Sequence, residues 1–287
     1  MKENVFLIVD VSNVAHRAAW GNKELKTSSG RFSGHVFGAV SILQALLRNE
    51  FKNQNVTIVF CHDGDSAKDY RLTILPTYKG NREPREFDPV PEVASLFRLW
   101  PGIHVCDKFK EGDDAMAYVA HARKGKPCVI FSGDKDLWTL MKLPNCKVFS
   151  PNLGRYVEYS DFYKHYRLRE FPERIPLAKS LFGDISDNIF GCKGLLKKQV
   201  EGLLNSPGVE TPEEFYNKLG DTKPDYISDK MWVKLQEAKE TVFKNYLVVL
   251  PCLDFKRESI VKVTGGFGPL KAALSGWECF SLIRRFN

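Results

Sequence analysis

The sequence has 287 residues, 43% of them hydrophobic, which is enough to bury the core of one large domain or two small ones. Its formal net charge of +7 favours a polyanionic partner. No apolar run approaches the roughly 18 residues of a membrane-spanning helix, and the start of the chain does not resemble a signal peptide. Its seven cysteines are widely spaced and form no C-x-x-C pair, which indicates reduced thiols rather than disulfides or a cysteine–zinc site. We therefore expect a cytoplasmic protein that does not bind membranes.

Short β-branched runs alternate with helical patterns in the first half of the chain. The predicted strands are 5–9, 56–60, 103–106 and 128–131, and the predicted helices are 36–47, 91–100 and 114–123. This alternation predicts an α/β fold with a parallel sheet and helices on both of its faces.

Acidic residues follow the predicted strands, and a further acidic group lies in a loop at 183–188. Ligands of open α/β sheets bind beyond the carboxyl ends of the parallel strands, so we expect the strand-end acids to meet at one rim. The candidate carboxylates are Asp10, Asp63, Glu111, Asp113, Asp114, Asp134, Asp136, Asp184 and Asp187. Each of these acids alone is as well explained by a helix cap or a turn, but the whole set is not.

Clustered carboxylates predict a metal site. Two like charges about 4 Å apart repel by roughly 4 kcal/mol at an effective dielectric constant near 20, so such a cluster needs cations or protons. Oxygen-only ligands select hard cations, and two ions can act together on a phosphate group. We predict two Mg²⁺ ions, for which Mn²⁺ can substitute.

The segment 65–90 interrupts the pattern, because it is rich in Lys and Arg and poor in apolar residues. It is interpreted as an exposed basic insertion carrying Lys68, Arg71, Lys79, Arg82 and Arg85. After residue 172 the pattern is mainly helical, with helices expected over 229–249 and 270–285. The expected organisation is an α/β core at 1–172 and a helical region at 173–287 packed on it.

Five short motifs occur in one order: IVDVSN at 8–13, YKGNR at 78–82, EGDD at 111–114, SGDKD at 132–136 and GDISDN at 183–188. In order and spacing they resemble the stand-alone 5′-nucleases of bacteriophages and bacteria, which are flap endonucleases and 5′→3′ exonucleases related to the nuclease domain of bacterial DNA polymerase I. The resemblance covers residues 5–200. It implies a PIN-like sheet, a helical arch at 65–90 and a helix–three-turn–helix DNA-binding region at 183–205.

The resemblance also implies roles for individual residues. One ion would be held by Asp10, Asp63, Glu111, Asp113 and Asp114, and the other by Asp134, Asp136, Asp184 and Asp187. Lys79 and Arg82 would reach the scissile phosphate as catalytic residues, and Tyr78 would stack on a base. The remaining implied DNA contacts are Arg17, Arg71, Lys193, Lys197 and Lys198.

Two residues depart from the family pattern, which has glycine at the positions of Val11 and Leu196. Leu196 would remove a left-handed position from the tight turn. This departure bears on the grip on duplex DNA and on a potassium ion at the helical hairpin, but not on the metal chemistry.

The implied activity is metal-dependent hydrolysis of DNA near 5′ ends, flaps or nicks, largely independent of sequence, in replication or repair. The protein would be a monomer, and it would act in the host cytoplasm if a phage encodes it. One alternative is a catalytically silent, structure-specific DNA-binding protein, although none of the matched acids is missing. Another is a haloacid-dehalogenase-type phosphatase with Asp63 as its nucleophile, and a third is a shorter PIN-type ribonuclease.

Overall fold

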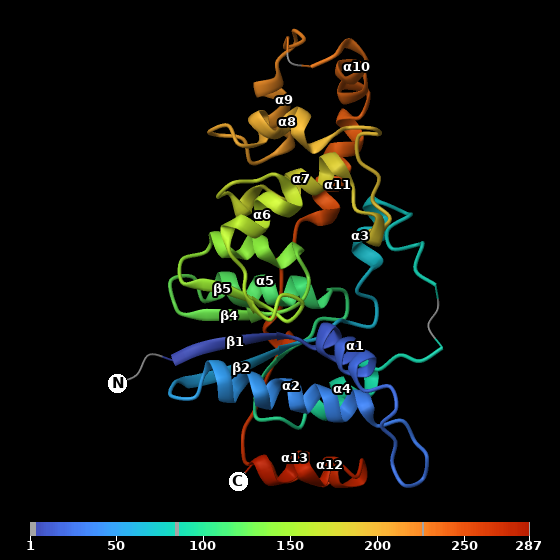
Figure 1. Cartoon of the computed structure of the whole chain (residues 1–287), viewed down its shortest axis with the longest axis vertical. Helices are drawn as coiled ribbons and strands as arrows, with labels where there is room; N and C mark the ends of the chain where they lie inside the picture. The colour runs from blue at the N-terminus through green and yellow to red at the C-terminus, as the bar shows by residue number, and fades with distance from the viewer. Residues whose placement is uncertain (1–3, 84–85, 226, 287) are drawn as a thin grey trace.

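The computed structural model describes residues 4–83, 86–225 and 227–286. Within these ranges, seven strands form one sheet in the order β6-β5-β4-β1-β2-β3-β7 (Figure 1). The strands are β1 Asn4–Asp10, β2 Asn55–Cys61, β3 Gly102–Val105, β4 Cys128–Phe131, β5 Cys146–Ser150, β6 Arg155–Tyr156 and β7 Ile260–Val263. The five inner strands are parallel, and the edge strands β6 and β7 are antiparallel to their neighbours.

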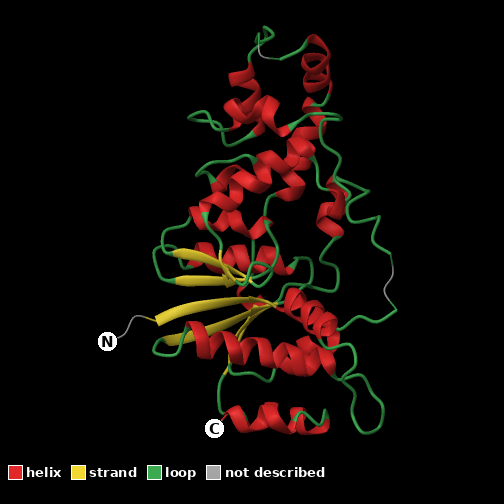
Figure 2. Cartoon of the chain, in the orientation of Figure 1, coloured by secondary structure: helices red, strands yellow, loops and turns green. Residues whose placement is uncertain are grey.

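Helices cover both faces of the sheet, which confirms the predicted α/β class (Figure 2). One face carries α1 Val11–Gly21, α2 Gly34–Glu50, α4 Val90–Phe97, α12 Gly268–Gly276 and α13 Phe280–Ile283. The other carries α5 Gly112–Ala122, η1 Asp136–Lys142, α6 Tyr159–Tyr166 and α7 Ile175–Phe182. Strand β1 lies at the centre, with Ile8 in one core and Leu7 and Val9 in the other. Because both faces are covered, β1 reads as a continuous apolar run rather than an alternating one.

The helical region extends away from one face of the sheet, and the chain then returns to the sheet (Figure 1). Its further elements are η2 Pro172–Arg174, η3 Ile185–Asp187, α8 Lys197–Leu204, α9 Pro212–Leu219, α10 Asp229–Glu237 and α11 Lys239–Val249. The helix expected over 229–249 is divided at Ala238, which ends α10 and begins α11. The helix expected over 270–285 is divided in the same way, because Glu278 adopts a left-handed φ of 56° between α12 and α13.

The last elements belong to the sheet layer rather than to the helical region. After η4 Arg257–Ser259, strand β7 pairs antiparallel with β3, and α12, α13 and η5 Arg284–Phe286 follow. The sequence analysis missed β7, β5 and β6. Strand β7 is an exposed edge strand of four residues, so burial does not produce a period-two pattern there.

The described part of the 65–90 insertion contains one short helix, α3 Asp69–Ile74, followed by turns. Arg85 lies outside the described residues. Within the described ranges, no helix is both long and apolar enough to cross a membrane.

Candidate active site

The carboxyl ends of the parallel strands bring several predicted acids to one rim. Asp10 ends β1 and caps α1, where its side chain accepts a hydrogen bond from Asn13 N (2.9 Å). Ser132 Oγ, which follows β4, donates to the other oxygen of Asp10 (2.7 Å). Asp63, after β2, accepts from Ser12 Oγ and from Gly112 N (2.6 Å) at the start of α5. Hydrogen bonds therefore connect the ends of β1, β2 and β4 with the start of α5, and the predicted meeting of these acids occurs.

Glu111 and Asp114 form a capping box at the start of α5 and meet the basic insertion. Nη1 and Nη2 of Arg71 donate to the two carboxylate oxygens of Asp114 (2.9 and 2.7 Å), and Nη1 also lies 3.0 Å from a carboxylate oxygen of Glu111. Tyr78 Oη donates to Glu111 (2.9 Å), and Lys79 Nζ donates to its other oxygen (2.7 Å).

The expected exposure of Arg71 and Tyr78 is wrong, because each side chain belongs to a residue that is only 5% exposed. Arg71 compensates the charge of buried Asp114, and the ring of Tyr78 packs in a small core with Ile189 and Val248. In this arrangement they position Glu111 and Asp114, and neither presents a free group to DNA.

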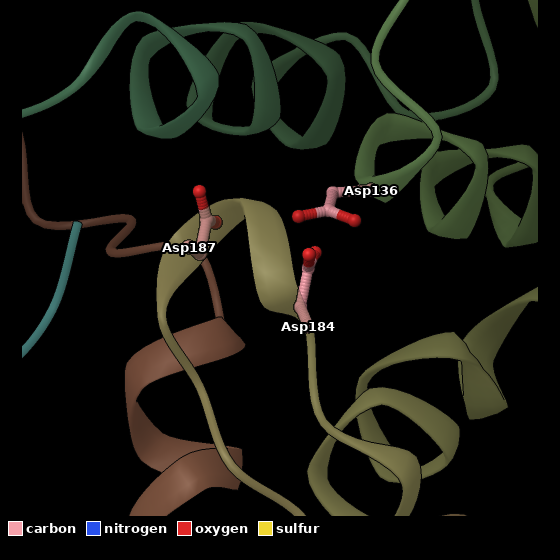
Figure 3. Close-up of side chains that lie close together, drawn as sticks. All are labelled: Asp136, Asp184 and Asp187. Atoms are coloured by element: carbon pink, nitrogen blue, oxygen red, sulfur yellow. The ribbon is translucent and has the colours of Figure 1, made fainter. Parts of the chain in front are cut away.

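A second acidic cluster lies beside the helical region. Oxygen atoms of Asp136, Asp184 and Asp187 all lie within 4.8 Å of one another, a donor set that fits a divalent cation (Figure 3). Asp136 comes from the segment after β4, whereas Asp184 precedes the short turn η3 and Asp187 is its last residue. Three of the four acids assigned to one ion by resemblance therefore lie together. The fourth, Asp134, is held beside Asp136, whose backbone N donates to Asp134 Oδ1 (2.9 Å).

Lys179 occupies part of this second cluster and was missed in the sequence analysis. Its Nζ donates to Asp136 and lies 2.7 Å from Asp184, and its side chain is 4% exposed. The signal was available, since Lys179 is the only charged residue in the apolar run IPLAKSLF at 175–182. A lysine inside such a helix is buried only when acids pair with it.

The electrostatics show for which acids burial and neighbouring carboxylates outweigh the compensating charges. Burial, with the charges of Asp63 and Asp134, raises the pKa of Asp10 to about 7. Burial and Asp134 raise the pKa of Asp136 to about 7 despite Lys179, and burial raises the pKa of Asp113 well above its usual value. At Asp184 burial also acts upward, but Lys179 and Ser186 outweigh it and hold the pKa at about 2. A bound cation would relieve the repulsion felt by the first three acids.

Two clefts meet at the acids. A cleft of 980 Å³ is lined by Asp10, Asp63, Glu111 and Asp113 together with the cations Lys68, Lys79 and Arg82. A second cleft of 700 Å³ is lined by Asp136, Lys179 and Asp184 together with Lys135, His165 and Lys197. Asp134 and Asn13 line both clefts. A chain that passes from one cleft to the other therefore crosses the carboxylates between two sets of basic side chains.

The YKGNR segment is docked on the turn that carries the second cluster. Lys79 N donates to the carbonyl of Asp187 (2.9 Å), and Asn81 Nδ2 donates to that of Ile185 (2.8 Å). Arg82 donates to the Asp187 carboxylate (2.8 Å). Lys79 has a φ of 53°, a conformation that costs a residue other than glycine free energy and is common where function fixes a side chain.

The other predicted DNA contacts lie farther out. Arg17 is exposed on α1 and donates to Asn152 (2.9 Å). Lys193, Lys197 and Lys198 are all exposed around the start of α8. The concern about Leu196 does not arise in this structure, because its φ is −91°, and the left-handed residue of that turn is Gly194 at 81°.

This combination of a parallel sheet, a rim of carboxylates and flanking cations defines a class: α/β proteins that process phosphate-containing polymers at a carboxylate metal site. The family can be stated directly. The family model of the 5′-3′ exonuclease N-terminal resolvase-like domain matches residues 5–173, and the chain belongs to this family. The suspected resemblance is confirmed, and the haloacid-dehalogenase interpretation is wrong.

The chain is similar to 5′-3′ exonucleases and to part of DNA polymerase I. The 5′-3′ exonuclease of Aquifex aeolicus is 30% identical over 211 residues, covering 70% of this chain and 69% of the relative. That of Mycoplasmopsis pulmonis is 25% identical, covering 87% of this chain and 81% of the relative. DNA polymerase I of Caldicellulosiruptor bescii is 28% identical over 83% of this chain, and the aligned region is only 28% of the polymerase.

Solved structures show the same fold. The chain aligns with the T5 5′-exonuclease containing bound zinc ions with a TM-score of 0.65, at 20% identity, over 98% of this chain and 96% of that one. It aligns with the catalytic core of Rad2 in complex with a DNA substrate with a TM-score of 0.54, at 15% identity, over 99% and 92% of the two chains. The PIN-like fold class predicted from the sequence is confirmed by these likenesses.

Proposed function

We propose that this protein is a metal-dependent 5′-nuclease that hydrolyses phosphodiester bonds at or near the 5′ ends of DNA strands, as a flap endonuclease and 5′→3′ exonuclease. The observation that carries the proposal is the convergence of acids from five chain segments beneath Lys79 and Arg82, in a chain of the 5′-3′ exonuclease family. Replication or repair of DNA is the process that such a cleavage serves.

The carboxylates would hold two Mg²⁺ ions, with Mn²⁺ as a substitute. Asp10, Asp63, Glu111 and Asp113 would serve the first site, and Asp134, Asp136, Asp184 and Asp187 the second. Asp114 would act on the first site through Glu111, because its own oxygens accept from Arg71 and from two backbone N–H groups. When bound, such ions supply Lewis acidity at the phosphate and lower the pKa of water.

Lys79 and Arg82 would contact the scissile phosphate. Both lie on the cleft that holds the first group of acids, so they can offset charge that develops on the phosphate oxygens. Burial lowers the pKa of Lys79, but Glu111, Asp187 and Asp113 outweigh it and raise the pKa, so its ammonium stays charged. A 5′ strand entering beneath the 65–90 insertion, as under an arch, would reach both cations.

Duplex DNA would dock on the hairpin before α8, with Lys193, Lys197 and Lys198 against its phosphates. Backbone N–H groups at the start of α8 add donors for phosphate, and Arg17 would take a phosphate of a displaced strand. A potassium ion bound at this hairpin would strengthen the same contact. These are phosphate contacts, so we expect binding by a monomer that depends steeply on salt and little on base sequence, in the cytoplasm of the cell or of a phage host.

A catalytically silent DNA-binding protein is the second candidate. It would use the same basic clefts but need no cation at the acids. The raised pKa values of Asp10 and Asp136 argue against it, because buried, repelling carboxylates cost stability unless a ligand uses them.

The test is cleavage of a 5′-labelled flap duplex by the wild type with Mg²⁺ and with EDTA, and by the Asp134→Ala and Asp136→Ala variants. We expect product only with Mg²⁺ and only from the wild type, and the product length separates flap cleavage from exonuclease action. The matched control is Asp229→Ala, whose side chain is 92% exposed on α10, and it should cleave like the wild type.

Two results would contradict the proposal. Cleavage that continues in EDTA would show that the reaction needs no metal ion. DNA binding without cleavage by a folded wild type supplied with Mg²⁺ would favour the catalytically silent protein. Circular dichroism of each variant establishes that it is folded before its rate is interpreted.

A further inference from the structure

Lys110 and Cys252 meet where the core joins the segment that returns from the helical region. Lys110 precedes Glu111, and Cys252 follows the end of α11, 142 residues later in the chain. Lys110 Nζ lies 2.7 Å from Cys252 Sγ. An N–H···O hydrogen bond spans about 2.7–3.2 Å, and sulfur is a larger atom than oxygen. The separation is therefore short for a hydrogen bond to sulfur.

One buried carboxylate holds the backbone on both sides of this pair. Asp114 Oδ1 accepts from Cys252 N (2.8 Å), and Asp114 Oδ2 accepts from the N–H of Glu111 (3.0 Å), the neighbour of Lys110. Arg71 fixes Asp114 through two hydrogen bonds and also donates to the carbonyl of Val248 (2.9 Å) near the end of α11. The main chain beside both members of the pair is therefore fixed.

Both groups are open to small oxidants. Lys110 and Cys252 are each partly exposed, and Cys252 is a free thiol. Among the other cysteines, Cys61, Cys128, Cys146, Cys192 and Cys279 are buried. Cys106 is also partly exposed, but its Sγ faces the carbonyl of Asp63 at 3.7 Å. Cys252 is thus the accessible thiol that has an amine in contact.

We propose that Lys110 and Cys252 are a modification site, at which hydrogen peroxide joins Nζ and Sγ through one bridging oxygen atom. A single oxygen with ordinary single bonds to nitrogen and sulfur, bent at the oxygen, spans the observed separation. The S–H bond and one N–H bond of the amine break, and N–O and O–S bonds form. Nitrogen and sulfur each lose two electrons.

The balance requires two molecules of hydrogen peroxide for each bridge. One of their oxygen atoms enters the bridge and the others leave as three molecules of water, with the hydrogens of the thiol and the amine among them. When the lysine starts as an ammonium, one further proton passes to solvent. Two molecules of a dithiol reverse the reaction: each is oxidised to its disulfide, and the four electrons and four protons that they supply return the amine, the thiol and one molecule of water.

The bridge has a mechanical consequence. It would add a covalent link between the loop that leads into Glu111 and the segment after α11, beside the hydrogen bond from Cys252 N to Asp114. Closing so long a loop removes conformational freedom from the unfolded chain, so the oxidised protein should unfold at a higher temperature than the reduced one.

The experiment is peptide mapping of the purified full-length protein after treatment with hydrogen peroxide, removal of excess peroxide and alkylation of remaining thiols. We expect a cross-linked pair containing Lys110 and Cys252, heavier by about 14 Da than the sum of the two peptides, because one oxygen is gained and two hydrogens are lost. Dithiothreitol should return the separate peptides. Lys110→Arg, Lys110→Gln and Cys252→Ser should abolish the pair, and the matched control Cys106→Ser should keep it.

Two outcomes would overturn the proposal. In one, Cys252 of the wild type gains only its own oxygens, about 16 or 32 Da, while Lys110 stays free. In the other, the cross-link is about 2 Da lighter than the sum, which means a direct N–S bond without the oxygen. The readout is a mass, so its failure leaves the nuclease proposal unaffected, and thermal unfolding of each variant shows that it is folded.

Discussion

Lys179 shows how a single buried charge can depend on the state of a site. Its ammonium lies between Asp136 and Asp184 and is almost completely buried, while the two acids remain about a quarter exposed. In the metal-free protein it supplies the positive charge that these carboxylates need. With a divalent cation bound nearby, the same acids would be less dependent on it.

We therefore expect Lys179→Met to lower the free energy of unfolding by about 1–3 kcal/mol in EDTA, and by less with Mg²⁺. Breaking a buried pair costs about 3–5 kcal/mol, and the partial exposure of both acids reduces that figure. Urea denaturation in the two solutions measures the difference. Lys223→Met is the control, because Lys223 pairs with exposed Asp229. An equal loss with and without Mg²⁺ would contradict this account.

At the residue scale, the sequence predicted where the acids gather better than it predicted which side chains pair with them. Most of the acids could be found because they follow strands, and strand ends meet at one rim, whereas Asp184 and Asp187 were found as an acidic group in the loop at 183–188. The burial of Arg71 and Tyr78 could not be predicted, because the insertion has no periodic apolar pattern and its inward face packs against Ile189 and the end of α11. The sequence of the insertion alone predicts exposed side chains at Tyr78 and Arg71, because it does not reveal which distant segments pack against them.

At the scale of elements, the docking of 77–82 on the 184–188 turn connects the insertion to the second acidic cluster. Asn188 Nδ2 donates to the carbonyl of Thr77 (2.7 Å), and Asn188 adopts a left-handed φ of 56°. This one residue both shapes the turn and binds the segment that carries Lys79. Loss of its amide should loosen that segment, although the hydrogen bonds of Lys79, Asn81 and Arg82 remain.

We expect Asn188→Gly and Asn188→Ala both to speed proteolysis within 66–90, since neither can donate to Thr77. The alanine variant should be less stable than the glycine variant by about 1 kcal/mol, because only glycine adopts a positive φ without cost. Limited proteolysis and urea denaturation measure the two effects separately.

Asn145 offers a matched control. It also has a left-handed φ, of 61°, and its Nδ2 donates to the carbonyl of Gly125 (2.9 Å), before the amino ends of β4 and β5 and so at the end of the sheet opposite the acids. Asn145→Ala and Asn145→Gly should show the same order of stability without faster cleavage in 66–90. Unchanged cleavage of the Asn188 variants would mean that other contacts hold the segment.

At the scale of the whole molecule, the acids set how stability depends on pH. Asp10 and Asp136 have pKa values raised to about 7, above the value of about 3.8 to 3.9 that an aspartate has in an unfolded chain. A raised carboxyl pKa contributes stability that is complete below the unfolded pKa and is lost as the pH rises through 7. The metal-free protein should therefore lose stability from these groups between pH 4 and pH 8.

A divalent cation should reverse this loss, so Mg²⁺ should raise the melting temperature more at pH 8 than at pH 5.5. Each kcal/mol corresponds to about 2–4 °C for a protein near this size. Thermal unfolding at both pH values, in EDTA and in Mg²⁺, is the measurement. Asp10→Asn should be more stable than the wild type at pH 8 in EDTA and should lose part of the benefit of Mg²⁺, because Asp136 belongs to the second site. An equal shift by Mg²⁺ at both pH values would count against binding at these acids.

The overall fold was largely predictable from the sequence, because buried parallel strands are continuous apolar runs and their helices are periodic. What escaped prediction were the strands β5 and β6 and the end of the chain. Strand β7 is short and exposed, and its place beside β3 depends on a contact more than 150 residues away in sequence. Neither propensity nor period carries that information.

This return of the chain to the sheet has a consequence for synthesis on the ribosome. Every acid of the site has been translated by Asp187, yet the free edge of β3 and the apolar face beneath α2 and α4 wait for residues 260–283. The nascent protein therefore contains all the acids of the site while one edge of β3 is still unpaired and an apolar surface is still exposed. Until β7, α12 and α13 emerge, that surface is a target for chaperones or for another nascent chain.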